Sequence, residues 1–171
     1  GNIAHGCSSI IADKLAINCG EYVVTEAGFG ADLGFEKFMD IKVRQGGPKP
    51  SAAVVVATIR GLKWHGGVAI KDMAGANPEA VRRGGENLKN ALRIVGLYGL
   101  PAVVAINRFP TDTPEEIAVV KEVAMAAGVI GVEEAKGFAE GGDGMIDLAH
   151  AVVKAANQPS DVKLLYEDDD D

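Results

Sequence analysis

The sequence has 171 residues, of which 47% are hydrophobic and 24% charged, and its formal net charge is −7. This composition is typical of a soluble globular chain, and the acidic balance argues against nucleic-acid binding, which requires a basic surface. No apolar run approaches the roughly 20 residues of a membrane span. The positions of Cys7, Cys19 and the histidines match neither a zinc site nor a redox motif, so we expect no metal site, reduced thiols and a cytoplasmic protein.

Four short apolar runs predict buried strands. They are rich in β-branched residues and do not alternate with polar ones, which is the pattern of strands covered on both faces in a mostly parallel sheet. The runs are residues 22–25, 53–58, 102–106 and 129–132.

Helices are expected between these strands, because capping residues and glycines mark their ends. The expected starts are Ser8 or Ser9, Asp32 or Gly34, Asn77 before Pro78, Thr113 before Pro114 in a capping box, and Asp143. The expected ends are Gly20, the residue before Gly46, Gly99 and Gly128. Apolar residues at helical spacing predict three inward faces: Val81, Leu88, Leu92 and Val95; Ile117, Val120 and Ala124; and Ile146, Ala149 and Val153. The alternating elements predict an α/β layered domain with right-handed crossovers.

The segments that follow the four expected strands are candidates for a binding site, because ligands of open parallel sheets bind outside the carboxyl ends of the strands. These segments combine glycine, charged and aromatic residues and comprise residues 25–34, 60–67, 107–112 and 133–142. They hold Phe29, Phe109 and Phe138. Each ring either stacks on a planar ligand or plugs the local core, and the glycines around Phe29 are equally compatible with a tight turn.

Charged residues in these segments allow two interpretations each. The cations Arg60, Lys63, His65 and Arg108 either bind an anionic substrate or are ordinary surface charges. Glu26 and Asp32 either hold magnesium or, for Asp32, cap the following helix. Asn107 is a weak indication of base or ribose recognition, and the sequence contains no Walker phosphate-binding loop.

The motifs in residues 2–6, 25–34, 57–67 and 105–113 closely resemble those of formate–tetrahydrofolate ligase, in the same order along nearly the whole chain. The resemblance implies ATP-dependent joining of formate to tetrahydrofolate by way of formyl phosphate, in a fold related to P-loop NTPases. It also implies that this chain is a central part of a longer enzyme whose Walker loop lies upstream, and that the part alone is inactive. It further implies Mg²⁺ with the ATP, a monovalent cation and a homotetramer.

The resemblance also assigns site residues. Phe109, Pro110 and Thr111 match the folate-pocket motif, Phe29 matches a phenylalanine at the ligand cleft, and Phe138 takes the place of a tryptophan that stacks on the pterin. The expected nucleotide-binding residues are Asn2, Asn107, Glu134 and Lys136, and the candidates for catalysis are His5 and Glu26.

We expect residues 1–161 to form the binding core and residues 162–171 to form a terminal segment with an acidic tail, at a boundary to a downstream region. The alternative to an enzyme is a non-catalytic nucleotide-binding or oligomer-assembly module. A Rossmann dehydrogenase is excluded, because no GxGxxG follows a strand and opens a helix.

Overall fold

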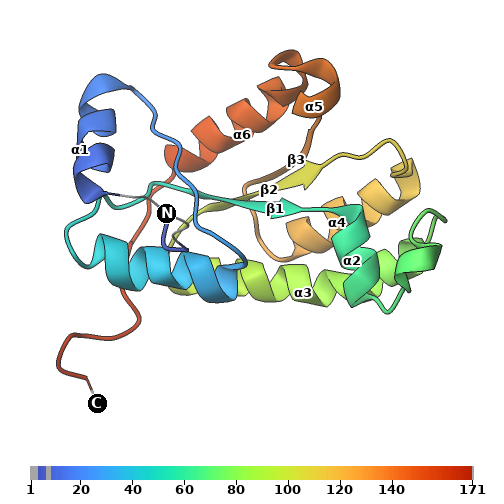
Figure 1. Ribbon diagram of the computed structural model, residues 1–171, viewed down its shortest axis with the longest axis horizontal. Helices are drawn as coiled ribbons and strands as arrows, with labels where there is room; N and C mark the ends of the chain where they lie inside the picture. Colours follow the sequence, from blue (N-terminus) through green and yellow to red (C-terminus); the bar gives the residue numbers. More distant parts are fainter. Residues whose placement is uncertain (1–3, 7–8, 171) are drawn as a thin grey trace.

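A computed structural model of the chain describes residues 4–6 and 9–170. Its centre is a parallel sheet of three strands, β1 (Ala53–Ala57), β2 (Ala102–Asn107) and β3 (Gly131–Ala135), in the order β1-β2-β3 (Figure 1). The register aligns Val55 with Val104 and Val104 with Val132. The predicted α/β fold with a parallel sheet is therefore confirmed.

The strand expected at residues 22–25 is wrong. The segment has no regular secondary structure and pairs with none of the described strands, and Val24 is 92% exposed. An apolar β-branched run favours extended backbone, but it becomes a strand only by pairing, and among the described residues β1 pairs with β2 and not with this segment. The last strand was also misplaced by two residues, since it begins at Gly131 and not at Val129.

The predicted helix starts at Ser9, Asn77 and Thr113 are confirmed. Ser9 accepts from two backbone amides of α1, Asn77 Oδ1 accepts from the Ala80 amide at 3.0 Å, and Thr113 forms a complete capping box. The helices are α1 (Ile10–Cys19), α2 (Ile59–His65), α3 (Pro78–Leu97), α4 (Pro114–Ala126), α5 (Gly137–Glu140) and α6 (Ile146–Ala156). Two π-helical segments, η1 (Ala31–Phe35) and η2 (Phe38–Val43), and two 3₁₀ turns, η3 (Ile70–Asp72) and η4 (Asp143–Met145), complete the elements.

Two of the predicted caps are wrong. Asp143 lies within η4, and α6 begins at Ile146 with no side-chain cap. Asp32 lies inside the first turn of η1, which follows Gly30. Short polar residues favour helix starts, but a preceding 3₁₀ turn or a glycine takes over that position here.

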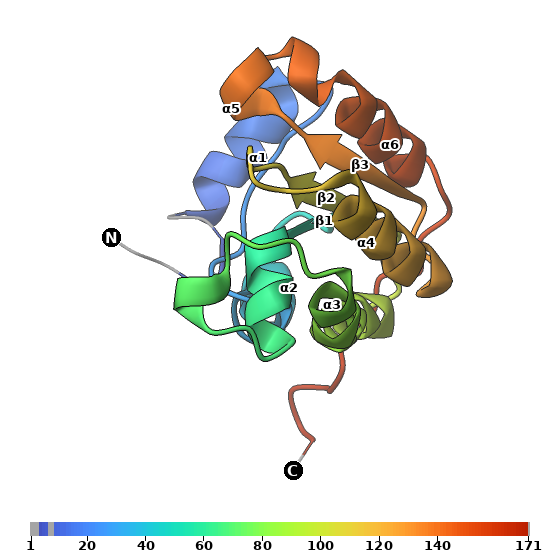
Figure 2. The ribbon, with the colours of Figure 1, turned by 90° about the vertical axis from the view of Figure 1, so that its right-hand side faces the viewer.

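One side of the sheet is covered by α2, α3 and α4, and α6 lies on the other side (Figure 2). The predicted inward faces of α3 and α4 are confirmed, because all seven of their residues are buried. The face predicted for α6 is wrong: Ile146 and Ala149 are exposed, whereas Leu148 and Ala155 are buried against Val103 of β2. The face of α6 that contacts the sheet is the one that carries Leu148 and Ala155. Apolar residues also lie on the neighbouring faces of this helix, so the sequence pattern did not identify the buried face.

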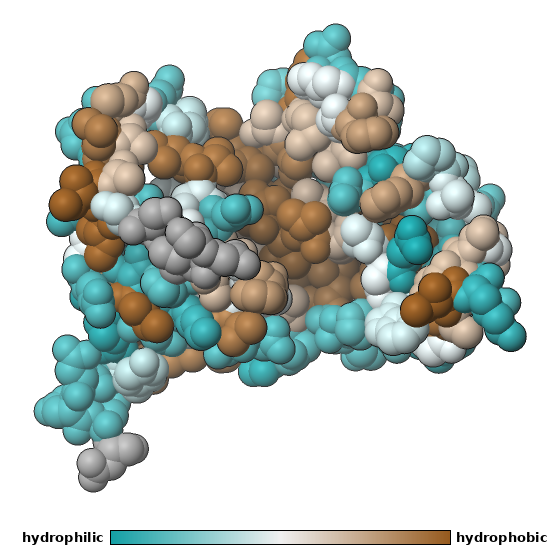
Figure 3. Space-filling model, in the orientation of Figure 1, coloured by the Kyte–Doolittle hydropathy of each residue, from teal (hydrophilic) through white to brown (hydrophobic). Residues whose placement is uncertain are grey.

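The α6 face of the sheet is covered mainly over β2 and β3. Val54 and Val56 of β1 point to this face and are 42% and 65% exposed. Figure 3 shows a hydrophobic hollow over β1 and β2, bordered by α1 on one side and by α5 and α6 on another. Within the described ranges, no helix is both long and apolar enough to cross a membrane.

Candidate functional site at the carboxyl ends of the strands

The carboxyl ends of β2 and β3 are joined by backbone and side-chain contacts at Arg108. Its amide donates to the Ala135 carbonyl oxygen at 3.1 Å, and its guanidinium forms an ion pair with Glu134. The second oxygen of Glu134 lies 3.5 Å from Nζ of Lys121 on α4. Figure 2 looks onto this end of the sheet. Arg108, expected at the rim, is therefore a link between two neighbouring strand ends.

Glu134 is ionised more readily than an ordinary glutamate. Burial alone would raise its pKa, but the hydrogen bond from Arg108 and the positive charges of Arg108, Lys121 and Lys136 outweigh burial and lower it. The carboxylate thus stands among cations, with one oxygen bonded to Arg108. Any nucleotide contact at Glu134 has to coexist with this pair.

The loop between β2 and α4 folds back on itself around Asp112. The carboxylate of Asp112 accepts from the Phe109 amide at 2.8 Å, and the Asp112 amide donates to the Phe109 carbonyl at 3.0 Å. Asp112 is buried, whereas Pro110 and Thr111 are exposed and Phe109 is 37% exposed. The sequence analysis missed this role of Asp112. The usual turn signal is an aspartate that accepts from an amide two residues after it, and Asp112 accepts instead from an amide three residues before it, so local spacing did not indicate this role.

Seven predicted site residues gather at the ends of these two strands. Asn107 ends β2 opposite Ala135, and α5 begins directly after Lys136. Phe138 of α5 is fully exposed, so its interpretation as a core plug is wrong. The residues brought to this edge are Asn107, Phe109, Pro110, Thr111, Glu134, Lys136 and Phe138.

The glycine-rich segment 25–34 forms a second group with residues 4–6. The Gly28 amide donates to the Ala4 carbonyl at 2.8 Å, and the Thr25 hydroxyl donates to the Gly6 carbonyl at 3.1 Å. A Cβ on Gly34 would stand 1.5 Å from the Gly28 carbonyl oxygen. These glycines therefore allow backbone to pack on backbone. The segment also follows no strand, so the expectation that it leaves the sheet edge is wrong.

Phe29 is exceptional within this segment. Its φ is 62°, a strained value for a residue with a side chain, and the residue is 78% exposed. The core-plug interpretation of Phe29 is therefore wrong, and strain of this kind concentrates at functional sites. Nearby in the chain, His5 is half-buried and Glu26 is exposed, while Asn2 lies outside the described residues.

The cations predicted at the rim do not share one environment. Arg60 and His65 are exposed, but Lys63 is 1% exposed and its Nζ lies 2.6 Å from Glu116 of α4. Lys63 is therefore neither a ligand-facing nor a surface charge. It faces inward because α2 packs against α3 and α4 on that side.

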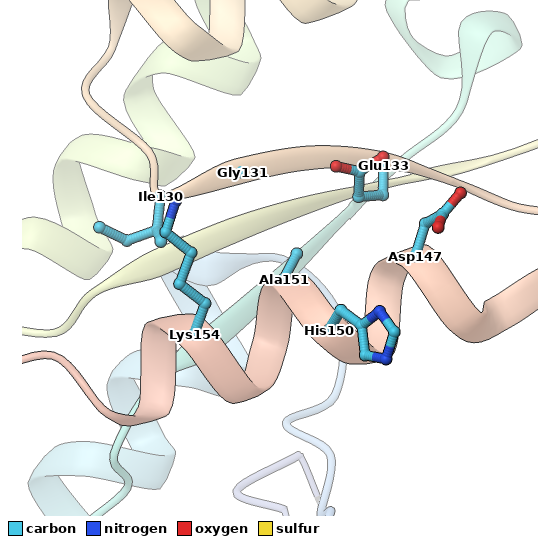
Figure 4. A pocket seen from close by; sticks show the side chains of 7 residues that line it. All are labelled: Ile130, Gly131, Glu133, Asp147, His150, Ala151 and Lys154. Carbon is cyan, nitrogen blue, oxygen red and sulfur yellow. The ribbon is translucent and has the colours of Figure 1, made fainter.

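A shallow hollow lies on the opposite flank of β3, between this strand and α6 (Figure 4). In the figure, Glu133 and Asp147 point to the same side, Lys154 reaches toward Ile130, and His150 points outward. Ile130 and Ala151 complete its lining. It contains none of the predicted site residues. Among the residues that the structure describes, no three His, Cys, Asp or Glu side chains gather to hold a metal ion.

Comparison with known proteins decides the family. The family model described as formate–tetrahydrofolate ligase matches residues 1–171. The chain belongs to the formate–tetrahydrofolate ligase family.

Curated formate–tetrahydrofolate ligases are similar along almost the whole chain. The protein of Sphingobium sp. (strain NBRC 103272 / SYK-6) is 57% identical over 168 residues, and that of Symbiobacterium thermophilum is 52% identical over 170 residues. The protein of Desulforamulus reducens is 47% identical over 175 residues. These matches cover 98–99% of this chain but only 30–31% of each relative, so the chain spans about 30% of their length.

Within this formate–tetrahydrofolate ligase segment, the motifs that predicted the family have two structural uses. The 105–113 motif builds the exposed loop at the end of β2, and the 25–34 motif builds a close backbone contact that presents Phe29. The 105–113 motif thus places side chains at the edge of the sheet, whereas the 25–34 motif requires glycine because a Cβ atom at Gly34 would clash with neighbouring backbone.

Proposed function

We propose that the chain is part of an ATP-dependent ligase that joins formate to tetrahydrofolate, giving 10-formyltetrahydrofolate, ADP and phosphate. Family membership and the names of the relatives support the proposal. The structural observation that carries it is the pair of exposed aromatic residues, Phe109 and Phe138, beside two neighbouring strand ends. A flat heterocycle fits such rings, since stacking adds about 1 kcal/mol beyond buried area.

The folate is proposed to lie against Phe109, Pro110 and Thr111 on one side and Phe138 on the other. Proline fixes its own φ, and the Asp112 contacts hold the Phe109 backbone, so this wall is ordered before the ligand binds. Phe138 is fully exposed in a four-residue helix and would gain most from burial by the pterin. Phe29 is proposed as a further contact of the folate.

The nucleotide is proposed to approach Asn107, Glu134 and Lys136, and Asn2 is kept as a further proposed contact. Lys136 supplies a positive charge for an anionic substrate, and Asn107 supplies an amide that can bond a base or ribose. MgATP is the expected substrate form, in a fold related to P-loop NTPases. The monovalent cation and the homotetramer remain expectations of the same resemblance.

Two steps account for the proposed reaction. A formate oxygen attacks the γ-phosphorus of ATP, and the bond from phosphorus to the ADP oxygen breaks, giving formyl phosphate and ADP. The folate amine then attacks the formyl carbon, the bond from carbon to the phosphate oxygen breaks, and the amine loses its proton. Phosphoryl transfer depends mainly on positioning and charge neutralisation. In this chain, the aromatic walls would position the amine and exclude water from formyl phosphate. His5 and Glu26 remain candidates for moving the proton.

The substitution Phe109→Ala tests the folate assignment in a polypeptide of the relatives' full length. We expect the KM for tetrahydrofolate to rise about five- to tenfold, because a stacking contact is worth about 1 kcal/mol, and the KM for MgATP to stay the same. Met125→Ala is the matched control, because Met125 is a 54% exposed apolar residue at the far end of α4.

Equal weakening of both substrates by Phe109→Ala would disprove the stacking role. Calorimetry of the parent protein with tetrahydrofolate and with MgATP tests the function itself. A parent that binds neither substrate would instead be an assembly module.

A further inference from the structure

A fully buried ion pair, Lys63–Glu116, connects α2 and α4. Nζ of Lys63 lies 2.6 Å from Oε1 of Glu116, and the two side chains are 2% and 0% exposed. Burying two charges costs desolvation energy, and a well-packed apolar pair is often at least as stable. A contribution to stability is therefore a poor explanation for this pair, and its hydrogen bonds to other groups indicate a different role.

The other hydrogen bonds of the two charged side-chain groups are all to backbone groups. Lys63 donates to the carbonyl oxygens of Met73 at 3.2 Å and Gly75 at 3.0 Å. Glu116 Oε1 also accepts from the Asn77 amide at 2.8 Å, and Oε2 accepts from the Thr113 amide at 3.1 Å. The pair thus fixes the segment before α3 and the residue at which the 108–113 loop ends.

The 108–113 loop is held at both ends, and Phe109 lies between them. Its first residue, Arg108, is bonded to β3 through Ala135, and its last, Thr113, is bonded to Glu116. Within the loop, Asp112 holds the Phe109 amide. Since Glu116 lies one turn into α4, its position and that of the loop end are coupled by the capping box as well.

Resting on the proposed function, we propose that Lys63 and Glu116 are positioning residues for tetrahydrofolate. Their ion pair holds the Thr113 end of the loop so that Phe109 faces the pterin in a fixed place. Neither side chain touches the ligand, because both are buried. Loss of the pair would weaken the site through disorder of the loop, and small displacements of positioning groups have large kinetic effects.

The test uses this sequence within a polypeptide of the relatives' full length. Glu116→Gln removes the charge and one backbone acceptor. The control is Glu122→Gln, also on α4, whose carboxylate pairs with Arg82 of α3 at the surface, with side chains 62% and 45% exposed. Steady-state rates are measured with each substrate varied, at a temperature where circular dichroism shows every protein folded.

We expect Glu116→Gln to raise the KM for tetrahydrofolate about tenfold, with kcat and the KM values for formate and MgATP within about twofold of the parent, because the loss concerns folate binding alone. Glu122→Gln leaves all constants unchanged. Glu116→Gln leaves the charge of Lys63 buried without its partner, and this can prevent folding. In that case the double substitution Lys63→Met with Glu116→Leu is used, because it removes both charges. It should keep the raised KM for tetrahydrofolate.

Other results overturn the proposal in distinguishable ways. Unchanged KM values for all three substrates, with or without a lower kcat, mean that the pair does not position the folate, and the positioning role is then wrong while the proposed function stands. A parent protein that forms no 10-formyltetrahydrofolate from formate, MgATP and tetrahydrofolate overturns both proposals.

Discussion

Replacing Gly34 by alanine tests whether the glycine-rich segment needs its glycines for packing. The new Cβ would lie 1.5 Å from the Gly28 carbonyl oxygen and 2.8 Å from that of Ala4, whereas ordinary contacts begin at 3.4 Å. The backbones would have to separate by about 2 Å, since packed interiors leave no spare space. Neither obstacle is the end of a flexible side chain, so the strain cannot be relieved by a rotamer change.

The separation would cost overpacking strain of about 1–3 kcal/mol and weaken the 2.8 Å bond from the Gly28 amide to Ala4, worth about 1 kcal/mol. We therefore expect Gly34→Ala to lower the free energy of unfolding by about 2–4 kcal/mol, measured by urea denaturation. Gly30→Ala is the matched control in the same segment, because its nearest obstacle is the movable Asp32 side chain and its φ is −91°. A Gly34→Ala protein as stable as the Gly30→Ala protein would refute the packing argument and favour a ligand-facing role for Gly34.

Three further predictions concern the core and α4. The pKa of Glu116 is lowered, because its bonds to Lys63 and backbone amides outweigh burial; its stabilisation is therefore present above the unfolded-state pKa and lost as pH falls through the folded value. Urea titrations should show the stability gap between the parent and Glu116→Gln narrowing in acid, and a constant gap would contradict the shift. Val104→Ala in β2 should cost about 2 kcal/mol and Val56→Ala well under 1 kcal/mol by calorimetric melting, since Val104 is 0% and Val56 65% exposed; equal losses would show that β1 is covered in solution. Thr113→Ala should cost about 1 kcal/mol through loss of the helix cap, and unchanged amide exchange in the first turn of α4 would count against it.

The pKa of Tyr98 is a separate consequence of the tertiary structure. Burial, followed by the hydrogen bond that its hydroxyl donates to Asp40, raises this pKa well above the ordinary value. The residue packs edge-to-face with Phe35 of η1, with ring centroids 5.4 Å apart. Because Tyr98 is the C-cap of α3, this contact fastens η1, which follows the glycine-rich segment, to the end of α3.

Local features were determined by the sequence alone. The caps at Ser9, Asn77 and Thr113 work through amides within three residues, so the chemistry needed to form them is adjacent in the chain. The three apolar runs that did become strands are likewise dictated by β-branched residues that must be covered on both faces. With the order of elements, these signals sufficed for a parallel α/β sheet and for the grouping of Asn107, Glu134 and their neighbours in the chain at its carboxyl edge.

Only the tertiary structure decided the features that depend on a distant partner. Residues 22–25 have the composition of a strand but pair with none of the three described strands. Lys63 is a charged residue of a type that is usually exposed, but here it is buried, because it forms an ion pair with Glu116, which lies far from it in the sequence. The glycines near Phe29 serve a contact with Ala4 that no local pattern reveals. Hydrogen bonds and charge pairs between remote segments form only when packing brings them together, so spacing along the chain cannot specify them.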